Sequence, residues 1–138
     1  MANKIQIQHP DVKEGFKTGA YSPGVVCDGW LYVSGQAAVD YPNGVYVLGS
    51  IEDETQRTMQ NVGRILEAAG CSWDDVVKST VHLANINDFA AYNEVYASYF
   101  TGVKPARTTV QSGLGHGIKV EIDVVAKVPT INWDEVAQ

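Results

Sequence analysis

Two side chains of opposite charge near the end of the chain, Arg107 and Glu121, could do chemistry together. They lie in two runs rich in β-branched residues, 105–110 and 119–125, which a glycine-rich segment separates. This pattern predicts a β-hairpin. Both residues are equally distant in sequence from Leu114, so the hairpin would place them opposite each other, with Cβ atoms about 5 Å apart. The residues alone leave two interpretations open: an ion pair on a solvated face, or a guanidinium and a carboxylate that point into one pocket.

Other motifs of catalytic or metal sites are not supported by the sequence. The three histidines are scattered without the spacing of metal ligands, so we expect no metal site. Cys27 and Cys71 form no Cys-x-x-Cys unit. The Gly-x-Gly-x-Gly pattern at 113–117 precedes a predicted strand rather than a helix, so it is not a dinucleotide-binding motif. His116 in this loop is expected to be solvated, with a role in substrate binding as the alternative.

The remaining candidates are polar side chains at the ends and edges of predicted strands. Spacing alone does not collect them into one site. They are Tyr21, Ser34, Asn93, Arg107, Thr109 and Glu121.

The first elements that must position these side chains are predicted strands. Residues 4–8 alternate polar and apolar side chains, which indicates a short strand. Residues 24–27 and 30–34 are apolar runs on either side of Asp28-Gly29. Asp-Gly in this setting predicts a tight β-hairpin, because a type I′ turn needs positive φ at both positions.

Two helices and a strand are predicted in the middle of the chain. Ser50 is expected to cap a helix that ends near Gly70, and a strand follows at 76–83. Asn87-Asp88 is expected to cap a second helix. Its aromatic stripe, which we assign to the core, is Phe89, Tyr92, Tyr96 and Tyr99. The order of elements predicts an α+β fold with two helices on one face of a mixed sheet.

Composition sets the size and the class of the protein. The chain has 138 residues, which predicts one domain over 1–138, with 130–138 as a surface tail. Charged residues make up 19%, below the average of roughly 25%, which favours an oligomer. The net charge is −6 without a basic block, which argues against nucleic-acid binding. Without a signal-peptide or membrane-spanning pattern, we expect a cytoplasmic protein.

Several short segments together resemble the Rid (YjgF-like) family of enamine/imine deaminases. The resemblance runs from about residue 19 to 127. The segments are Gly19-Ala20-Tyr21-Ser22-Pro23-Gly24, Leu31 to Gln36, Asn61 to Gly70, Asp75 to Lys78, Asn87-Asp88-Phe89, Asn93 to Tyr96 and Pro105-Ala106-Arg107.

The resemblance implies a chorismate-mutase-like fold that assembles as a homotrimer, with sites between subunits and no metal or organic cofactor. It also implies hydrolysis of small 2-imino acids, or of enamines such as 2-aminoacrylate, to 2-oxo acids and ammonia. Arg107 matches the arginine that binds the substrate carboxylate, and Glu121 matches the acidic residue that positions or activates water. The other matching pocket positions are Tyr21, Ser34, Gly35 and Asn93.

The sequence departs from the family pattern at three places. Thr109 stands where many members have a cysteine, the loop 112–117 lacks the usual proline, and the segment 37–50 differs at the expected entrance of the site. These departures leave three alternatives open. The protein could act on a larger ring-cleavage enamine such as 2-aminomuconate, bind a carboxylate without turnover, or cleave RNA. The acidic charge argues against ribonuclease activity.

Overall fold

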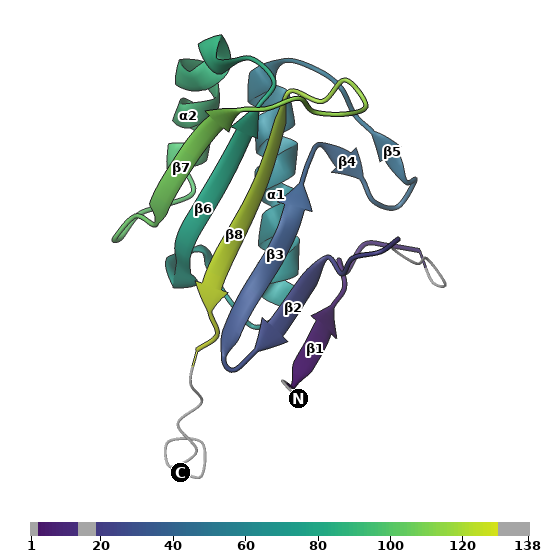
Figure 1. Ribbon diagram of the computed structural model, residues 1–138, viewed down its shortest axis with the longest axis vertical. Coiled ribbons are helices and arrows are strands. Elements are labelled where there is room, and N and C mark those ends of the chain that lie inside the picture. Colours follow the sequence, from purple (N-terminus) through teal and green to yellow (C-terminus); the bar gives the residue numbers. More distant parts are fainter. Residues whose placement is uncertain (1–2, 14–18, 130–138) are drawn as a thin grey trace.

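The computed structural model describes residues 3–13 and 19–129. The predicted surface tail, 130–138, lies outside the described residues. The strands are β1 (Lys4–Ile7), β2 (Gly24–Cys27), β3 (Trp30–Gln36), β4 (Val39–Asp40), β5 (Val45–Tyr46), β6 (Val76–Leu83), β7 (Ala106–Gln111) and β8 (Val120–Lys127). The helices are α1 (Ile51–Ala68) and α2 (Phe89–Ala97), with 3₁₀ turns at Trp73–Asp75 and Ile86–Asp88 (Figure 1).

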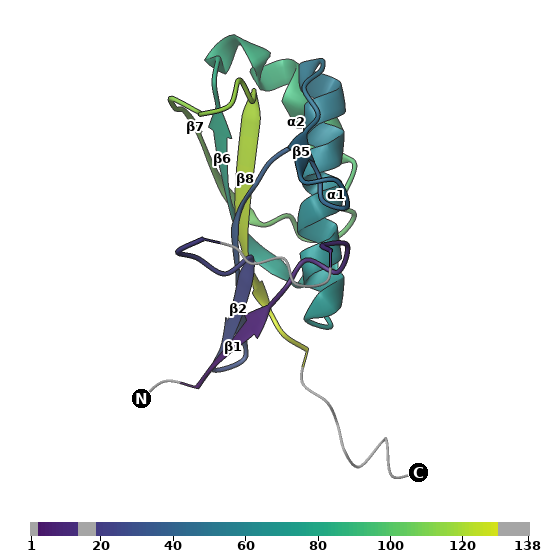
Figure 2. The ribbon, with the colours of Figure 1, turned by 90° about the vertical axis from the view of Figure 1, so that its right-hand side faces the viewer.

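Within the described residues, six strands form one mixed sheet in the order β1-β2-β3-β8-β6-β7. Only β6 and β7 run parallel, and the other neighbours are antiparallel. Both helices cover the same face of the sheet (Figure 2). The predicted α+β fold with two helices on one face is therefore confirmed. No helix in the described part of the chain is long and apolar enough to cross a membrane.

The predicted hairpin between 105–110 and 119–125 is wrong. β7 pairs with β6 alone, and β8 lies on the other side of β6, between β6 and β3. The segment between β7 and β8 therefore crosses over the end of β6 (Figure 1). Glycine-rich sequence permits such a crossing as readily as a tight turn, and the parallel pairing of β6 and β7 leaves no local signal.

The tight turn and the ends of the first helix were predicted correctly from the sequence. Asp28 and Gly29 have φ of 54° and 81° and join β2 to β3. Ser50 accepts a hydrogen bond from the Asp53 amide at the start of α1, and Gly70 has φ of 76°. Asp88 stands at the N-cap of α2, as predicted, but its side chain makes no capping hydrogen bond, whereas the side chain of Asn85 caps the preceding 3₁₀ turn.

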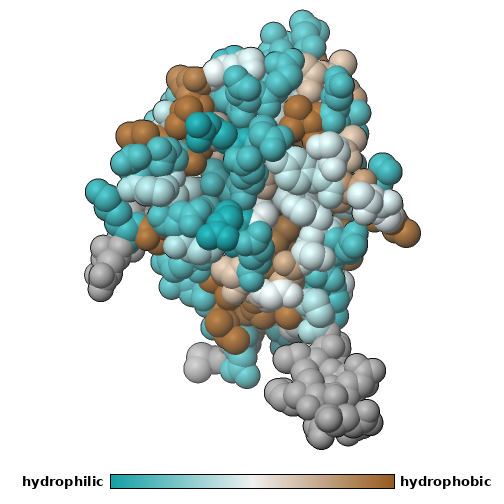
Figure 3. All heavy atoms as spheres, turned by 180° about the vertical axis from the view of Figure 1, so that it is seen from behind, coloured by the Kyte–Doolittle hydropathy of each residue, from teal (hydrophilic) through white to brown (hydrophobic). Residues whose placement is uncertain are grey.

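The core lies between the sheet and α1. Alternate residues of β8 are buried there (Val120, Ile122, Val124 and Ala126), together with Met59, Val62, Ile65 and Leu66 of α1. The outer side of the helix layer is mainly hydrophilic (Figure 3). Because strand side chains alternate between faces, burial of the even positions of β8 turns Glu121 and Asp123 to the opposite, uncovered face.

A buried carboxylate ties α1 to the start of β8. Glu54 is fully buried and accepts hydrogen bonds from the backbone amides of Gly49 and Lys119. It also pairs with the Lys119 ammonium at 3.1 Å. These contacts fix the backbone two residues before Glu121, and so they help to set where Glu121 lies.

Replacing this carboxylate should destabilise the fold. We expect Glu54→Ala to lower the free energy of unfolding by about 3 kcal/mol, because three donors lose their partner. Chemical denaturation at a fixed protein concentration measures the change. The matched control is Glu94→Ala on the exposed side of α2, which should stay within about 0.5 kcal/mol of the unchanged protein. Equal effects of the two substitutions would contradict the assigned role of Glu54.

Candidate functional site

The first group of candidate residues surrounds the guanidinium of Arg107, at the start of edge strand β7. The guanidinium lies over three rings of α2, those of Phe89, Tyr92 and Tyr96, at 5.4, 5.7 and 4.9 Å from the ring centres. It donates a hydrogen bond to Oδ1 of Asn93. The aromatic stripe therefore serves the core and also holds this cation, which the assignment to the core alone missed.

No carboxylate neutralises Arg107 within the described ranges, because no salt bridge to it occurs there. The side chain is exposed and borders a cavity of about 360 Å³. Thr109, two residues along the same strand, shares a 2.8 Å hydrogen bond with the Tyr92 hydroxyl. Asn93, Arg107 and Thr109 thus form one group on the helix side of the sheet, where the guanidinium can bind an anion with its planar fork.

The second group lies at an irregularity of β3. The register between β3 and β8 shifts between Val33 and Gln36, so Ser34 and Gly35 leave the regular ladder. Hydrogen bonds fix both the backbone and the side chain of Ser34. Its amide donates to the Pro23 carbonyl at 2.9 Å, and its hydroxyl donates to the Ser22 carbonyl at 2.6 Å. β-Bulges commonly re-aim residues in this way near functional sites.

Glu121 lies directly against Gly35. A Cβ atom added to Gly35 would be 2.8 Å from Cδ of Glu121, closer than real contacts allow. Only glycine therefore leaves room for the carboxylate in this position. Tyr21, Ser34, Gly35 and Glu121 all line a second cavity of about 610 Å³.

A second carboxylate, Asp123, lines the same cavity. Burial raises the pKa of this carboxyl above its usual value, and the nearby His82 and Lys78 oppose that shift. Its position could have been predicted, because residues two apart on a strand share a face. Two further residues that line this cavity, Tyr41 and Tyr46, were also missed. His116 is exposed as expected, but its ring stacks on Tyr46 at 4.5 Å.

The two groups do not meet within one chain. Arg107 aligns with Ser79 of β6, whereas Glu121 aligns with His82, so they are offset along the strands. Their strands are two positions apart in the sheet, which separates the backbones by roughly 10 Å. Arg107 lies on the helix side and Glu121 on the uncovered side. The predicted placement of Arg107 and Glu121 opposite each other, facing one pocket of the same chain, is therefore wrong, and so is the alternative of an ion pair between them.

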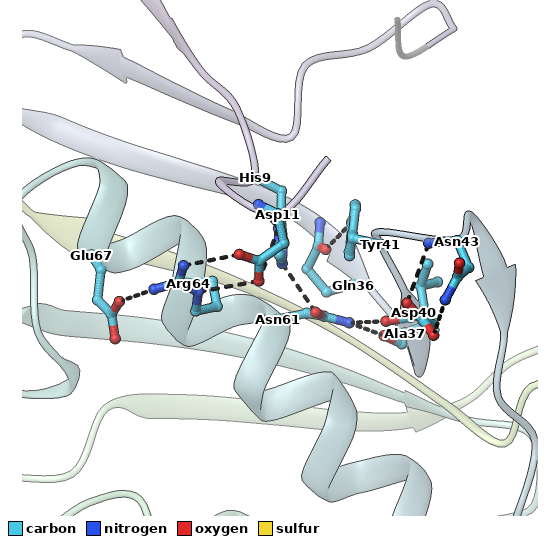
Figure 4. A network of polar contacts seen from close by, with 11 residues as sticks. His9, Asp11, Gln36, Ala37, Asp40, Tyr41, Asn43, Asn61, Arg64 and Glu67 are labelled. Carbon is cyan, nitrogen blue, oxygen red and sulfur yellow. Dashed lines mark hydrogen bonds and ion pairs between the residues drawn. The ribbon is translucent and has the colours of Figure 1, made fainter. Parts of the chain in front are cut away.

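The described residues offer no cluster of three or more metal-ligating side chains from His, Cys, Asp and Glu. His82 donates or accepts at Nδ1 with the Ser112 hydroxyl, 2.9 Å away, and its Nε2 is 3.8 Å from Asp123. His9 is buried and belongs to a separate network of polar contacts that includes Asn61 (Figure 4).

The chain is similar to known proteins in both sequence and fold. A family model described as "Endoribonuclease L-PSP" matches residues 14–128. The chain is 46% identical to rat 2-iminobutanoate/2-iminopropanoate deaminase over 78% of this chain and 80% of that protein. A Yersinia pestis protein of the Rid family has a TM-score of 0.85 at 36% identity, covering 91% of this chain and all of that one. Escherichia coli TdcF with bound serine has a TM-score of 0.80 at 31% identity, covering 89% and 98% of the two chains.

Adding a methyl group at Gly35 should displace the Glu121 carboxylate. We expect a crystal structure of Gly35→Ala to show the Glu121 side chain in another rotamer, because the added Cβ overlaps its present position. Gly113→Ala is the matched control, since a Cβ there meets no atom within 4 Å. A Gly35→Ala structure with Glu121 unmoved would show that the backbone, and not the carboxylate, absorbs the contact.

Proposed function

The chain belongs to the Rid family, whose model is described as endoribonuclease L-PSP, and from this premise we propose that it is an imine/enamine deaminase. It hydrolyses small 2-imino acids and their enamine tautomers to 2-oxo acids and ammonia. In support, its rat relative is named a 2-iminobutanoate/2-iminopropanoate deaminase. The observation that carries the proposal is Arg107, an exposed cation fixed at a cavity with no carboxylate bound to it in the described part of the chain.

The substrate carboxylate binds to Arg107. A guanidinium offers two parallel donors to a carboxylate, and each charge-assisted hydrogen bond contributes roughly 1.5–3 kcal/mol. Asn93 and the rings of α2 fix the orientation of the fork. Thr109 replaces a thiol at this position, so its hydroxyl supplies hydrogen bonding without nucleophilic thiol chemistry.

Glu121 acts on water. It accepts a proton as the water oxygen adds to C2 of the imine, and that proton goes on to the nitrogen of the resulting amino alcohol. Glu121 then passes the hydroxyl proton of the amino alcohol to the nitrogen, the C–N bond breaks, ammonia leaves, and the carbonyl of the 2-oxo acid forms. Overall, one imine and one water give one 2-oxo acid and one ammonia. Tyr21, Ser34 and Gly35 form the wall around this position.

The complete site lies between subunits of a homotrimer. Arg107 and Glu121 are on opposite faces of one sheet, so one small substrate cannot reach both within a single chain. In a closed ring of copies, Arg107 of one copy meets Glu121 of the partner subunit, and every interface holds one site. No metal or organic cofactor takes part in these steps.

The ribonuclease named in the family description is not the activity that we propose. The net charge of −6 disfavours a nucleic-acid backbone, which binding proteins neutralise with clustered lysine and arginine. A larger ring-cleavage enamine is an alternative substrate for the same steps, and comparison of substrates decides between the two.

Replacing Arg107 should remove most of the catalysis. With 2-aminoacrylate generated by a serine dehydratase, we expect Arg107→Ala to lower kcat/KM by about 100-fold or more, because two charge-assisted hydrogen bonds are lost. The measurement is the loss of imine in excess of the uncatalysed rate. The matched control is Lys127→Ala, which removes a cation stacked on Trp30 outside both cavities and should keep full activity. Full activity in Arg107→Ala would contradict the proposal.

Two inactive variants should restore each other when mixed as subunits. We expect Arg107→Ala and Glu121→Gln, each inactive alone, to regain about a quarter of the wild-type activity after joint unfolding and reassembly, since a random ring pairs intact halves at one interface in four. Coexpressed, differently tagged chains provide purified mixed trimers, in which one interface in three should be intact. Mixed oligomers without activity would contradict a site shared between subunits.

A further inference from the structure

Tyr41 occupies a wall of the 610 Å³ cavity and is not among the residues that the family resemblance assigns to the site. It lies between β4 and β5, in a small two-stranded sheet apart from the main one. Its ring is half-buried, and it borders the same cavity as Ser34, Gly35 and Glu121. Any molecule that reacts beside Glu121 therefore lies within the space that Tyr41 bounds.

The ring of Tyr41 is held in place from two sides. One face stacks on the imidazole of His9, with ring centres 3.7 Å apart and planes 12° from parallel. Its hydroxyl donates to Oε1 of Gln36, and the Gln36 amide donates to the Ser34 carbonyl at 3.1 Å. Burial raises the pKa of Tyr41 to about 12, so the phenol remains a neutral donor. Tyr41 is thereby connected to the bulge that presents Ser34 and Gly35.

His9 is itself buried and is held in place by hydrogen bonds (Figure 4). Its Nδ1 accepts the backbone N–H of Asp11, so the ring proton lies on Nε2 and is donated to Asn61 Oδ1 at 3.0 Å. The Asn61 amide donates in turn to the carbonyls of Ala37 and Val39, at 2.9 and 3.0 Å. Burial lowers the pKa of His9 and so favours this neutral form.

The N-terminal segment that carries His9 is anchored to α1 by charge. Asp11 binds Arg64 with two hydrogen bonds, of 2.9 and 3.2 Å. Arg64 also pairs with Glu67 of the same helix. The stack of His9 on Tyr41 therefore rests on the rigid helix, and the wall does not depend on the small β4–β5 sheet alone.

The chemistry of the cavity indicates which side chains fit. Besides Tyr41, its wall includes Tyr21, Tyr32 and Tyr46, and its charged lining residues are the carboxylates of Glu121 and Asp123. None of the described residues that line it is a lysine or arginine. The volume of this cavity in the single chain is about 610 Å³, within the range of about 300–1,000 Å³ that is typical of ligand pockets.

We propose that Tyr41 is a specificity-determining residue, positioned by His9, that makes this site prefer 2-imino acids with large uncharged side chains. The inference rests on the proposed function. With the carboxylate on Arg107 and C2 beside Glu121, the side chain is the remaining large substituent of C2, and it packs against the tyrosine wall. Aromatic and aliphatic side chains gain burial and ring contacts there. Acidic side chains meet the two carboxylates and are disfavoured.

The test compares imino acids generated in situ by amino-acid oxidases from phenylalanine, leucine, alanine and glutamate. Catalase removes the peroxide, and semicarbazide traps the imine that remains. For the unchanged protein we expect kcat/KM at least about tenfold higher for the phenylalanine and leucine imines than for the alanine imine, and lowest for the glutamate imine. Tyr41→Ala should reduce the phenylalanine-to-alanine ratio about tenfold, because the ring contact is lost.

Matched variants distinguish the loss of the Tyr41 ring contact from a general loss of activity or stability. Tyr41→Phe keeps the ring, so the ratio of kcat/KM for the phenylalanine imine to that for the alanine imine should stay within about threefold of the unchanged protein. His9→Ala should lower the ratio, and His9→Phe should restore it because a ring is stacked on Tyr41 again. In the Tyr41→Ala background, His9→Ala should have no further effect on the ratio, since both act through one wall. If Tyr41→Ala does not fold, Tyr41→Val provides the same comparison.

The outcomes distinguish this inference from the function on which it rests. If no imine is hydrolysed faster than without protein, the proposed function fails and the inference falls with it. If the alanine imine is accelerated but larger imines are not preferred, or if Tyr41→Ala keeps the unchanged ratio, only the role of Tyr41 is overturned.

Discussion

The position of β6 between β7 and β8 is the constraint on which the site depends. Because β6 separates these strands, Arg107 at the start of β7 and Glu121 near the start of β8 cannot form the cross-strand pair that their spacing implies. Each side chain instead belongs to its own cavity, one on each face of the sheet. Among the described residues no carboxylate pairs with Arg107, so its guanidinium can bind the carboxylate of a ligand. A single chain carries two half-sites, and the chemistry that we propose requires two chains.

Buried polar groups of α1 hold the half-site around Glu121. Glu54 fixes the backbone ahead of Glu121, and Asn61 fixes the backbone carbonyls of Ala37 and Val39 near the bulge. Each of these side chains has several partners, which is the condition under which burial of polar atoms is tolerated. Both side chains come from α1, so this helix positions backbone segments that carry residues of the opposite, uncovered face. The helix α2 does the same for Arg107, with three aromatic rings and a hydrogen bond from the guanidinium to Asn93.

Sequence reasoning succeeded where structure is decided locally. Asp28-Gly29 requires a tight turn, and Ser50 and Gly70 mark the ends of α1. It was wrong about the partner of β7, because strand pairing across a long connection is decided by packing rather than by neighbours in sequence. Tyr41 was missed for a related reason. It lies in turn-forming sequence, and only the folded N-terminal segment brings His9 beneath it.

The central claim is that one substrate is held by two chains, and a crystal structure of the protein with a bound 2-oxo acid such as 2-oxobutanoate tests it most directly. We expect the ligand carboxylate on the Arg107 guanidinium, with the ligand C2 within reach of Glu121 of the partner subunit. A ligand bound entirely within one chain would contradict the claim. So would an oligomer in which a carboxylate of the partner subunit neutralises Arg107 and fills its cavity.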